Sequence, residues 1–470
     1  MNCSRRSFLV SAGCAGLFAR RLWAAMKYDR DAVLDLFRMR RADTDARVKA
    51  GIEANRKGSI LFRFVDASGK PLERVHVKLR QTGHDFKYGA NLFMLGEFKS
   101  QEQNAAYEEL FAGAFNLATI PFYWTGTEPE RGKTRYGRNS PPLYRRPPPD
   151  LCIEWCEAHG IMPKAHILNY ASVTPEWAIG DIHSEKHLLD KRYREIAERY
   201  AGRVKMWEVT NETMWGPYFK NPKTANIYRS DDLVEWSFKL AERHFPANEL
   251  IINEAHCRIW KDPWFNRNRS PYYMQIERAI ANGARVDAVG LQFHMFHPCA
   301  DVVKETRQFY DPERLFDVME TYARFGLPMQ ITEITIPAYS SDPGDEEVQA
   351  EILRELYRIW FSQRGMEAII YWNVPDGYAA FAEPGDFSGG ENAYYGGLCR
   401  FDLTAKPSYA VIKDLFGKEW RSGADEEVAD RWVFRGFYGT YDAEFTSNGR
   451  TVARKIHLGR EEAPHITVEI

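Results

Sequence analysis

The sequence has no long run of like charge, no internal repeat and no low-complexity tract. Its 63 Lys and Arg residues nearly balance its 65 Asp and Glu residues, which leaves a formal net charge of −2. A balanced charge provides no field that would attract a polyanion, so we expect no nucleic-acid partner. The 470 residues are enough for one large barrel with a smaller appended domain.

Cysteine is scarce as well. Seven cysteines occur, and two of them, Cys3 and Cys14, lie in the N-terminal leader described below. The remaining five are an odd number in a long chain, so we expect no disulfide framework. Cys152 and Cys156 are four residues apart in a helical pattern, and we expect them to pack on one helix face. The sequence indicates no metal and no cofactor.

No apolar run is long enough to span a membrane. The stretch Phe8–Phe18 is too short, but it follows S-R-R-S-F-L at Ser4–Leu9, which is similar to a twin-arginine export signal. Small residues end the segment at Ala24 and Ala25. We therefore expect a signal peptide over residues 1–25, a periplasmic or extracellular location and no membrane partner. The alternative is a short basic, apolar leader without an address.

Between the chain ends, strand-like runs alternate with helical stretches, a pattern that implies a parallel sheet. Eight strands are predicted, and with their helices they predict a (β/α)8 TIM barrel over residues 87–418. The strands are Lys87–Asn91, Leu117–Pro121, Met162–Leu168, Met206–Glu212, Leu250–Glu254, Ala288–His294, Met329–Ile334 and Ala368–Trp372.

The two ends of the chain have a different pattern. After a helical segment, Tyr28–Arg56, the runs Ser59–Val65 and Arg74–Arg80 alternate apolar and polar residues, and we predict a β-hairpin. Arg431–Ile470 alternates in the same way. Because a two-stranded hairpin is marginal alone, we expect residues 26–86 and 419–470 to combine into one small β-sandwich beside the barrel.

Two glutamates stand out at strand ends. W-E-V-T-N-E-T, Trp207–Thr213, starts as a strand that ends at Asn211-Glu212. P-M-Q-I-T-E-I-T-I-P, Pro328–Pro337, places Glu333 among apolar neighbours. Barrel active sites lie at the C-terminal strand ends, and a buried carboxylate is costly unless it is paired or functional. Glu212 and Glu333 therefore fit a glycosidase, which needs one protonated and one ionised carboxyl group.

Other polar and aromatic residues end the predicted strands and would converge on the same cleft. A composition of 14% aromatic residues also suits sugar stacking, although a large core uses many rings. The strand-end candidates are Asn91, His166, Asn211, Asn253, Glu254, His256, Gln292, His294 and Trp372.

The motifs together resemble glycoside hydrolase family 10, whose best-known members are endo-β-1,4-xylanases. The similar segments include K-A-H-I-L-N-Y, W-E-V-T-N-E, I-I-N-E-A-H, A-V-G-L-Q-F-H-M, I-T-E-I-T-I and Y-W-N-V-P-D-G-Y, within Lys87–Leu415. The resemblance implies retaining hydrolysis of xylan or a decorated xylan-like polysaccharide, by a chain that we take to be a monomer.

The resemblance also implies residue roles. Glu212 would be the acid/base and Glu333 the nucleophile. The substrate-binding residues would be Asn211 at the sugar 2-hydroxyl, His166 at the −1 sugar, Trp372 as its floor, Gln292 and His294 beside the nucleophile, and Asn91, Tyr170 and Asn253.

The sequence departs from the family pattern on the non-reducing side of the cleft. Thr119–Trp124 lacks the polar groups that usually follow the second strand, and Tyr170, Ala171 and Val173 replace typical Trp, His and Gln residues. Ala380-Phe381 stands where a second Trp is expected. We therefore expect weak activity on plain linear xylan and a preference for acylated, methylated or branched chains.

Two other classes remain open at this point. One is a carbohydrate-binding barrel with weak or lost catalysis. The other is a metal-dependent barrel hydrolase that would use His166, Glu254, His256 and His294, although the first strand has no H-x-H motif.

Overall fold

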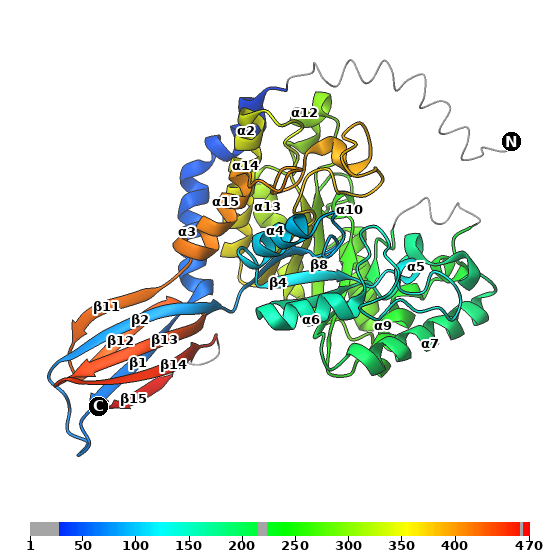
Figure 1. Ribbon diagram of the computed structural model, residues 1–470. Helices are drawn as coiled ribbons and strands as arrows, with labels where there is room; N and C mark the ends of the chain where they lie inside the picture. Colours follow the sequence, from blue (N-terminus) through cyan, green and yellow to red (C-terminus); the bar gives the residue numbers. More distant parts are fainter. Residues whose placement is uncertain (1–27, 215–222, 461–463) are drawn as a thin grey trace.

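Eight parallel strands form a closed barrel (Figure 1). Their sequences are largely apolar because each strand is buried on both faces. The computed structural model describes residues 28–214, 223–460 and 464–470. The (β/α)8 barrel that the sequence predicts is confirmed. In order around the barrel, its strands are β10 (Met366–Tyr371), β3 (Lys87–Asn91), β4 (Leu117–Pro121), β5 (Met162–His166), β6 (Met206–Asn211), β7 (Glu249–Glu254), β8 (Ala288–His294) and β9 (Met329–Thr335).

The helices around the barrel begin at residues suited to a helix N-terminus. Asp181, Asp311 and Asp342 accept backbone N–H groups as N-caps, and several helices have Pro in the first turn, where no N–H is needed. The main helices are α4 (Gln101–Ala112), α6 (Pro149–His159), α7 (Ile182–Tyr200), α9 (Leu233–His244), α11 (Pro271–Ala281), α13 (Pro312–Tyr322), α14 (Pro343–Ser362) and α15 (Pro407–Asp414). Within the described residues, no helix is both long enough and apolar enough to cross a membrane.

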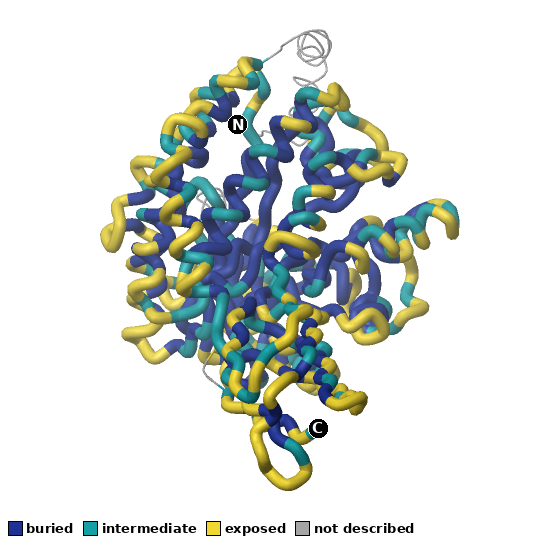
Figure 2. The backbone as a smooth tube through the Cα atoms, turned by 90° about the vertical axis from the view of Figure 1, so that its left-hand side faces the viewer, coloured by how far each residue is buried: buried dark blue, intermediate teal, exposed yellow. Residues whose placement is uncertain are grey.

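The N-terminal helical segment is two helices rather than one. It divides at Arg40 into α2 (Arg30–Met39) and α3 (Arg41–Arg56). Both lie along α14, which is buried between them and the barrel (Figures 1 and 2). Arg30 pairs with Asp345 at 2.7 Å, so the first residue of α2 is fixed to the first turn of α14.

The two chain ends form a β-sandwich beside the barrel, as the sequence predicts. A three-stranded sheet has the order β12 (Arg431–Phe437), β1 (Lys57–Val65), β15 (His465–Glu469). A four-stranded sheet has the order β11 (Gly423–Val428), β2 (Val75–His84), β13 (Gly439–Ser447), β14 (Arg450–Leu458). Phe62 and Phe64 pack against Phe445 across the core, with ring centroids 5.4 and 5.3 Å apart.

The expected hairpin between β1 and β2 is wrong. The two strands lie in different sheets of the sandwich. Both edges of β1 are hydrogen-bonded by β12 and β15, and both edges of β2 by β11 and β13. Each N-terminal strand is therefore an interior strand of its sheet, between C-terminal strands, and the two do not pair with each other.

An aromatic contact joins the sandwich to the barrel. Phe437 of β12 lies 6.1 Å from Phe361 of α14, and Phe361 stacks on Trp420 at 3.8 Å. The buried guanidinium of Arg56 donates to the carbonyl oxygens of Phe361 and Gln363. The sandwich is thus attached to the barrel by apolar packing and by a buried cation whose donors are satisfied.

This arrangement predicts that the N-terminal strands depend on the tail. Deleting Trp432–Ile470 would remove most of β12 and all of β13, β14 and β15, so β1 would lose both neighbours. We expect loss of solubility and a lower melting temperature. In the full chain, Phe445→Ala should cost about 3–5 kcal/mol of unfolding free energy, because it leaves a cavity in the sandwich core.

Val433→Ala is the matched control, because Val433 is 60% exposed on β12. It should change the unfolding free energy by less than about 0.5 kcal/mol. Chemical denaturation measures both variants. A truncated chain that melts and dissolves like the full one would show that the N-terminal strands do not need the tail.

Candidate active site

The barrel brings the predicted residues together at the C-terminal ends of its strands. Glu212 and Trp372 lie one residue beyond β6 and β10, and Tyr170 lies in the loop after β5. The other candidates end or nearly end their strands: Asn91 on β3, His166 on β5, Asn211 on β6, Asn253 on β7, Gln292 and His294 on β8, and Glu333 on β9. This is the face at which barrel enzymes place their catalytic residues.

Glu333 is fixed by three N–H donors from neighbouring strands. Its Oε1 accepts hydrogen bonds from Asn253 Nδ2 at 2.9 Å and from Gln292 Nε2 at 3.0 Å. Its Oε2 lies 3.1 Å from His294 Nε2. Donors aimed at a carboxylate favour its ionised form and restrict its rotation.

Glu212 shares one of these donors. Gln292 Nε2 also lies 3.1 Å from Glu212 Oε1, while the Tyr170 hydroxyl donates to Glu212 Oε2 at 2.6 Å. Because one nitrogen contacts both carboxylates, their Oε1 atoms are at most about 6.1 Å apart. Inverting glycosidases need about 6.5–9.5 Å and retaining ones about 5–5.5 Å, so the geometry favours the retaining arrangement.

The backbone at Glu212 is unusual. Its φ of 50° lies in the left-handed region, which costs a residue with a Cβ about 1–2 kcal/mol. Its N–H donates to the carbonyl oxygen of Asn253 on β7 at 3.2 Å, which fixes the turn. Such strain concentrates at functional sites, where surrounding contacts hold it.

Asn211 and Asn253 extend the hydrogen-bond network around Gln292 and Glu333. Asn253 Nδ2 donates to Asn211 Oδ1 at 2.9 Å, and Asn253 Oδ1 accepts from the Thr332 hydroxyl at 2.6 Å. Gln292 Nε2 lies 3.1 Å from Asn211 Oδ1. The Asn211 carbonyl oxygen is therefore occupied, and its amide nitrogen remains available as a donor.

His294 acts as a neutral donor in this geometry. Burial lowers its pKa to about 4, so the ring is neutral near pH 7. The tautomer with its proton on Nε2 donates to the Glu333 carboxylate, and its Nδ1 can then accept from the Thr335 hydroxyl, 2.9 Å away. Sequence analysis placed His294 beside the nucleophile, and the structure puts it in contact with that carboxylate.

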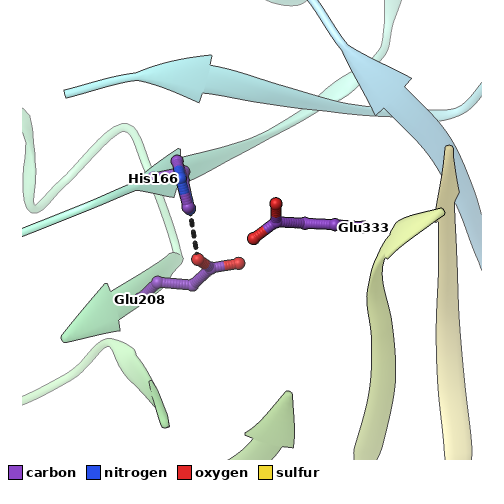
Figure 3. Close-up of side chains that lie close together, drawn as sticks. All are labelled: His166, Glu208 and Glu333. Carbon is purple, nitrogen blue, oxygen red and sulfur yellow. Dashed lines mark hydrogen bonds and ion pairs between the residues drawn. The ribbon is translucent and has the colours of Figure 1, made fainter. Parts of the chain in front are cut away.

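A buried charge cluster lies beneath Glu333, and sequence analysis did not identify two of its members. Glu208 forms an ion pair with Lys164 through Oε1. Its Oε2 forms an ion pair with His166 (Figure 3). All three side chains are almost fully buried. The missed signal is strand alternation, since Lys164 and His166 are two residues apart on β5 and point to the same face.

His166 is engaged on both sides of its ring. Nδ1 contacts Glu208, and Nε2 lies 3.0 Å from the Tyr123 hydroxyl. The sequence gave no reason to choose Tyr123, which follows β4 in the stretch that lacks the usual polar groups. A direct contact of His166 with a sugar stays a prediction.

His166, Glu208 and Glu333 could in principle hold a metal ion, because their ligand atoms lie within 4.8 Å of one another (Figure 3). The Lys164 ammonium already forms an ion pair with Glu208, and its positive charge would repel a metal ion at this place. The four residues named for a metal hydrolase, His166, Glu254, His256 and His294, form no such group within the described part of the chain. The cluster is better suited to positioning than to metal binding.

Burial raises the pKa of Glu333, and the negative charges of Glu208 and Glu212 raise it further. The cations of the cluster, His166 and Lys164, act in the opposite direction. The charge state of Glu333 therefore depends on its burial and on the charged groups around it. Burial also raises the pKa of Glu254 to about 7, with a contribution from Glu212.

Aromatic rings form the wall next to the carboxylates. Trp372 makes edge contacts with Phe93, His166 and His294 at centroid distances of 5.3, 5.5 and 5.7 Å. Phe93, Tyr123, Ile167 and Trp372 form one apolar cluster, against which Tyr170 and Val173 pack. The predicted floor residue, Trp372, therefore lies in a rigid group of rings.

A closed parallel barrel with two hydrogen-bonded glutamates at its C-terminal face defines the class of (β/α)8-barrel glycoside hydrolases. The comparisons with known proteins name the family. The model of glycosyl hydrolase family 10 matches residues 88–414, more than half of the chain. The chain belongs to this family.

Relatives of known name are distant. Anti-sigma-I factor RsgI6 of Acetivibrio thermocellus is 24% identical over 84% of this chain and 46% of its own length. Endo-1,4-beta-xylanase 2 of Arabidopsis thaliana is 22% identical over 89% of this chain and 35% of its own. The chain thus spans less than half the length of these two relatives.

Shorter relatives match the barrel. Endo-1,4-beta-xylanase B of Thermotoga neapolitana is 24% identical, and the match covers 66% of this chain and 83% of that protein. Among solved structures, xylanase 10B of Thermotoga petrophila in complex with xylobiose superposes with a TM-score of 0.55 at 22% identity. That match covers 71% of this chain and 95% of the other, and it establishes the shared fold.

The buried cluster predicts how the pH dependence should change. A nucleophilic Glu333 must be ionised, so the acid limb of kcat/KM follows its pKa. Glu208→Gln removes a negative charge that raises this pKa, and the limb should move about one unit toward lower pH. Lys164→Met removes a positive charge that lowers the pKa, and the limb should move toward higher pH.

The profiles are measured well below the melting temperature of each variant, because breaking a buried ion pair destabilises the fold. Glu426→Gln, an exposed change in the sandwich, is the control and should leave the limb in place. Shifts of the same sign in both cluster variants would contradict this electrostatic assignment.

Proposed function

We propose that this chain is a retaining endo-β-1,4-glycosidase that acts on xylan or a decorated xylan-like polysaccharide. One observation carries the proposal: Gln292 Nε2 lies within 3.1 Å of both Glu212 and Glu333, so their Oε1 atoms are at most about 6.1 Å apart, below the range of about 6.5–9.5 Å that inverting enzymes need. Family membership supports the substrate class.

In the first step Glu333 attacks the anomeric carbon while protonated Glu212 donates a proton to the leaving oxygen. The three donors on Glu333 hold its oxygens in place for this attack. In the second step Glu212 removes a proton from water, which attacks the anomeric carbon and releases Glu333. The configuration of the sugar is retained because two inversions occur.

The surrounding residues would bind the sugar at the cleavage point. The Asn211 amide, whose carbonyl oxygen is already occupied, would donate to the 2-hydroxyl. Trp372 would lie beneath the apolar face of the −1 sugar, where an aromatic ring stacks well on C–H groups. A barrel that only bound carbohydrate would not require two carboxylates fixed by a shared donor.

Export is a further proposal, supported by the sequence alone. The twin-arginine motif and the whole predicted signal, residues 1–25, lie outside the described residues. In a bacterial host, Arg5→Lys with Arg6→Lys should retain the chain in the cytoplasm, as measured by cell fractionation. Unchanged export of this double variant would rule out the twin-arginine route.

The catalytic roles predict different effects for the two glutamates. Glu333→Ala should abolish turnover, and azide should restore it with an inverted product, because azide attacks directly from the vacated side. Glu212→Ala should lower turnover of unactivated oligosaccharides by about 10²–10⁴. It should spare the first step on nitrophenyl glycosides, whose leaving group needs no proton.

The wild-type product configuration, followed by NMR, completes the test and should be retained. Turnover should also persist in EDTA. Near wild-type activity of either variant on an unactivated oligosaccharide would refute the assignment of the pair.

A further inference from the structure

Two adjacent arginines lie beside the active site in the loop between α5 (Trp124–Thr127) and α6. Arg145 is 4% exposed, and its Nη1 donates to Asn373 Oδ1 at 2.8 Å and to the carbonyl oxygen of Tyr378 at 2.6 Å. Arg146 is half-buried, and its Nη1 donates to the carbonyl oxygen of Arg145 at 2.8 Å. Sequence analysis singled out neither residue.

Both arginines are close to the carboxylate pair. The Arg146 guanidinium carbon lies 3.9 Å from the centre of the Tyr123 ring, and the Tyr123 hydroxyl contacts His166. Asn373, which holds Arg145, directly follows Trp372 and is also contacted by Asn91 at 3.3 Å. A single ring or side chain therefore separates the arginines from the predicted −1 site.

The charge of these arginines is not balanced locally. Within the described part of the chain, neither guanidinium has a carboxylate at ion-pair distance. Burial lowers the pKa of Arg146 to about 10, and the charge of Arg145 lowers it further. Two adjacent cations removed from water are costly unless an anion accompanies them.

The nearest acidic groups are already committed. Glu391 Oε2 accepts a hydrogen bond from Asn373 Nδ2 at 3.1 Å, and thus reaches Arg145 only through an amide. Burial raises the pKa of Glu97 to about 7, which weakens it as a counter-charge near neutrality. Both remain outside ion-pair distance of Arg146.

Other buried arginines in this region have a different environment. Arg135 and Arg192 each donate through Nε and both Nη atoms to carbonyl or hydroxyl oxygens, which explains them as structural contacts. Arg146 donates only through Nη1 to the described residues. Its Nε and Nη2 hydrogens therefore remain available at a half-exposed position.

We propose that Arg146, backed by the buried Arg145, binds the carboxylate of a uronic acid carried by the polysaccharide substrate. A guanidinium presents a planar pair of donors that matches a carboxylate, and the anion would balance both charges. The stretch Thr119–Trp124, which lacks the family's usual sugar-binding groups, lies against this cation through Tyr123. Specificity on this side thus comes from charge rather than from an apolar surface.

The inference rests on the proposed glycosidase function and is tested with three matched oligosaccharides. One carries a uronosyl branch, one carries the same branch with its carboxyl reduced to an alcohol, and one is linear and undecorated. At low salt, kcat/KM on the uronosyl substrate should exceed that on the reduced one by about tenfold or more, since charge-assisted hydrogen bonds are strong. The ratio should fall as salt is added.

Variants assign the preference to Arg146. Arg146→Gln should reduce the ratio between uronosyl and reduced substrates toward one, and Arg146→Lys should keep part of it. Arg131→Gln is the matched control, because Arg131 is an exposed arginine of the same loop. The ratio of kcat/KM between uronosyl and reduced substrates should be the same in this variant as in the wild type. Because the Lys variant keeps the positive charge, the test does not depend on one substitution folding.

Binding separates this inference from the proposed function. Calorimetry with the Glu333→Gln protein compares the affinities of the uronosyl and reduced oligosaccharides without turnover. Preference in binding without wild-type turnover on any substrate would overturn the glycosidase proposal and support the carboxylate site. Equal kcat/KM and equal affinity for the two branched substrates would overturn the carboxylate site.

Discussion

The site depends on one shared hydrogen-bond donor, the Gln292 amide between Glu212 and Glu333. Two carboxylates that approach each other in a buried site repel, and one must take a proton unless donors compensate the charge. Gln292 supplies a donor to each, while Asn253 and His294 complete the shell of Glu333. These donors lie on β7 and β8, between Glu212 after β6 and Glu333 on β9, so barrel closure itself sets the distance between the two carboxylates.

The ion cluster beneath the pair sets its electrostatics. Glu208 is held by Lys164 and His166, and the three side chains are almost fully buried. Their net effect on Glu333 is a balance between one negative and two positive groups in a low-dielectric interior, where Coulomb interactions are strong. A change in Glu208 or Lys164 should alter the pH dependence without removing a predicted sugar contact.

The wall of the cleft differs from the family pattern in the stretch Thr119–Trp124. The stretch after β4 contributes the Tyr123 ring, and Arg145 and Arg146 bring charge to its outer side from a loop about twenty residues further along. The expectation of an apolar surface there was incomplete, because Thr119–Trp124 does not form that wall alone. The expected preference for decorated substrates remains, with a carboxylate as the decoration that the charges favour.

The sequence by itself determined the barrel, its strand ends and the two glutamates, because apolar strands and their polar ends are local patterns. It did not determine the pairing of β1 and β2, which are separated by a turn and so suggested a hairpin. Their hydrogen-bonding edges are taken by strands more than 300 residues away, β12, β13 and β15 among them. Glu208, Lys164, Tyr123 and the two arginines have roles only through contacts between different strands and loops. Strand alternation could place Lys164 and His166 on one face of β5. Contacts with partners on other strands and loops leave no periodicity in the sequence, so the tertiary structure alone decided them.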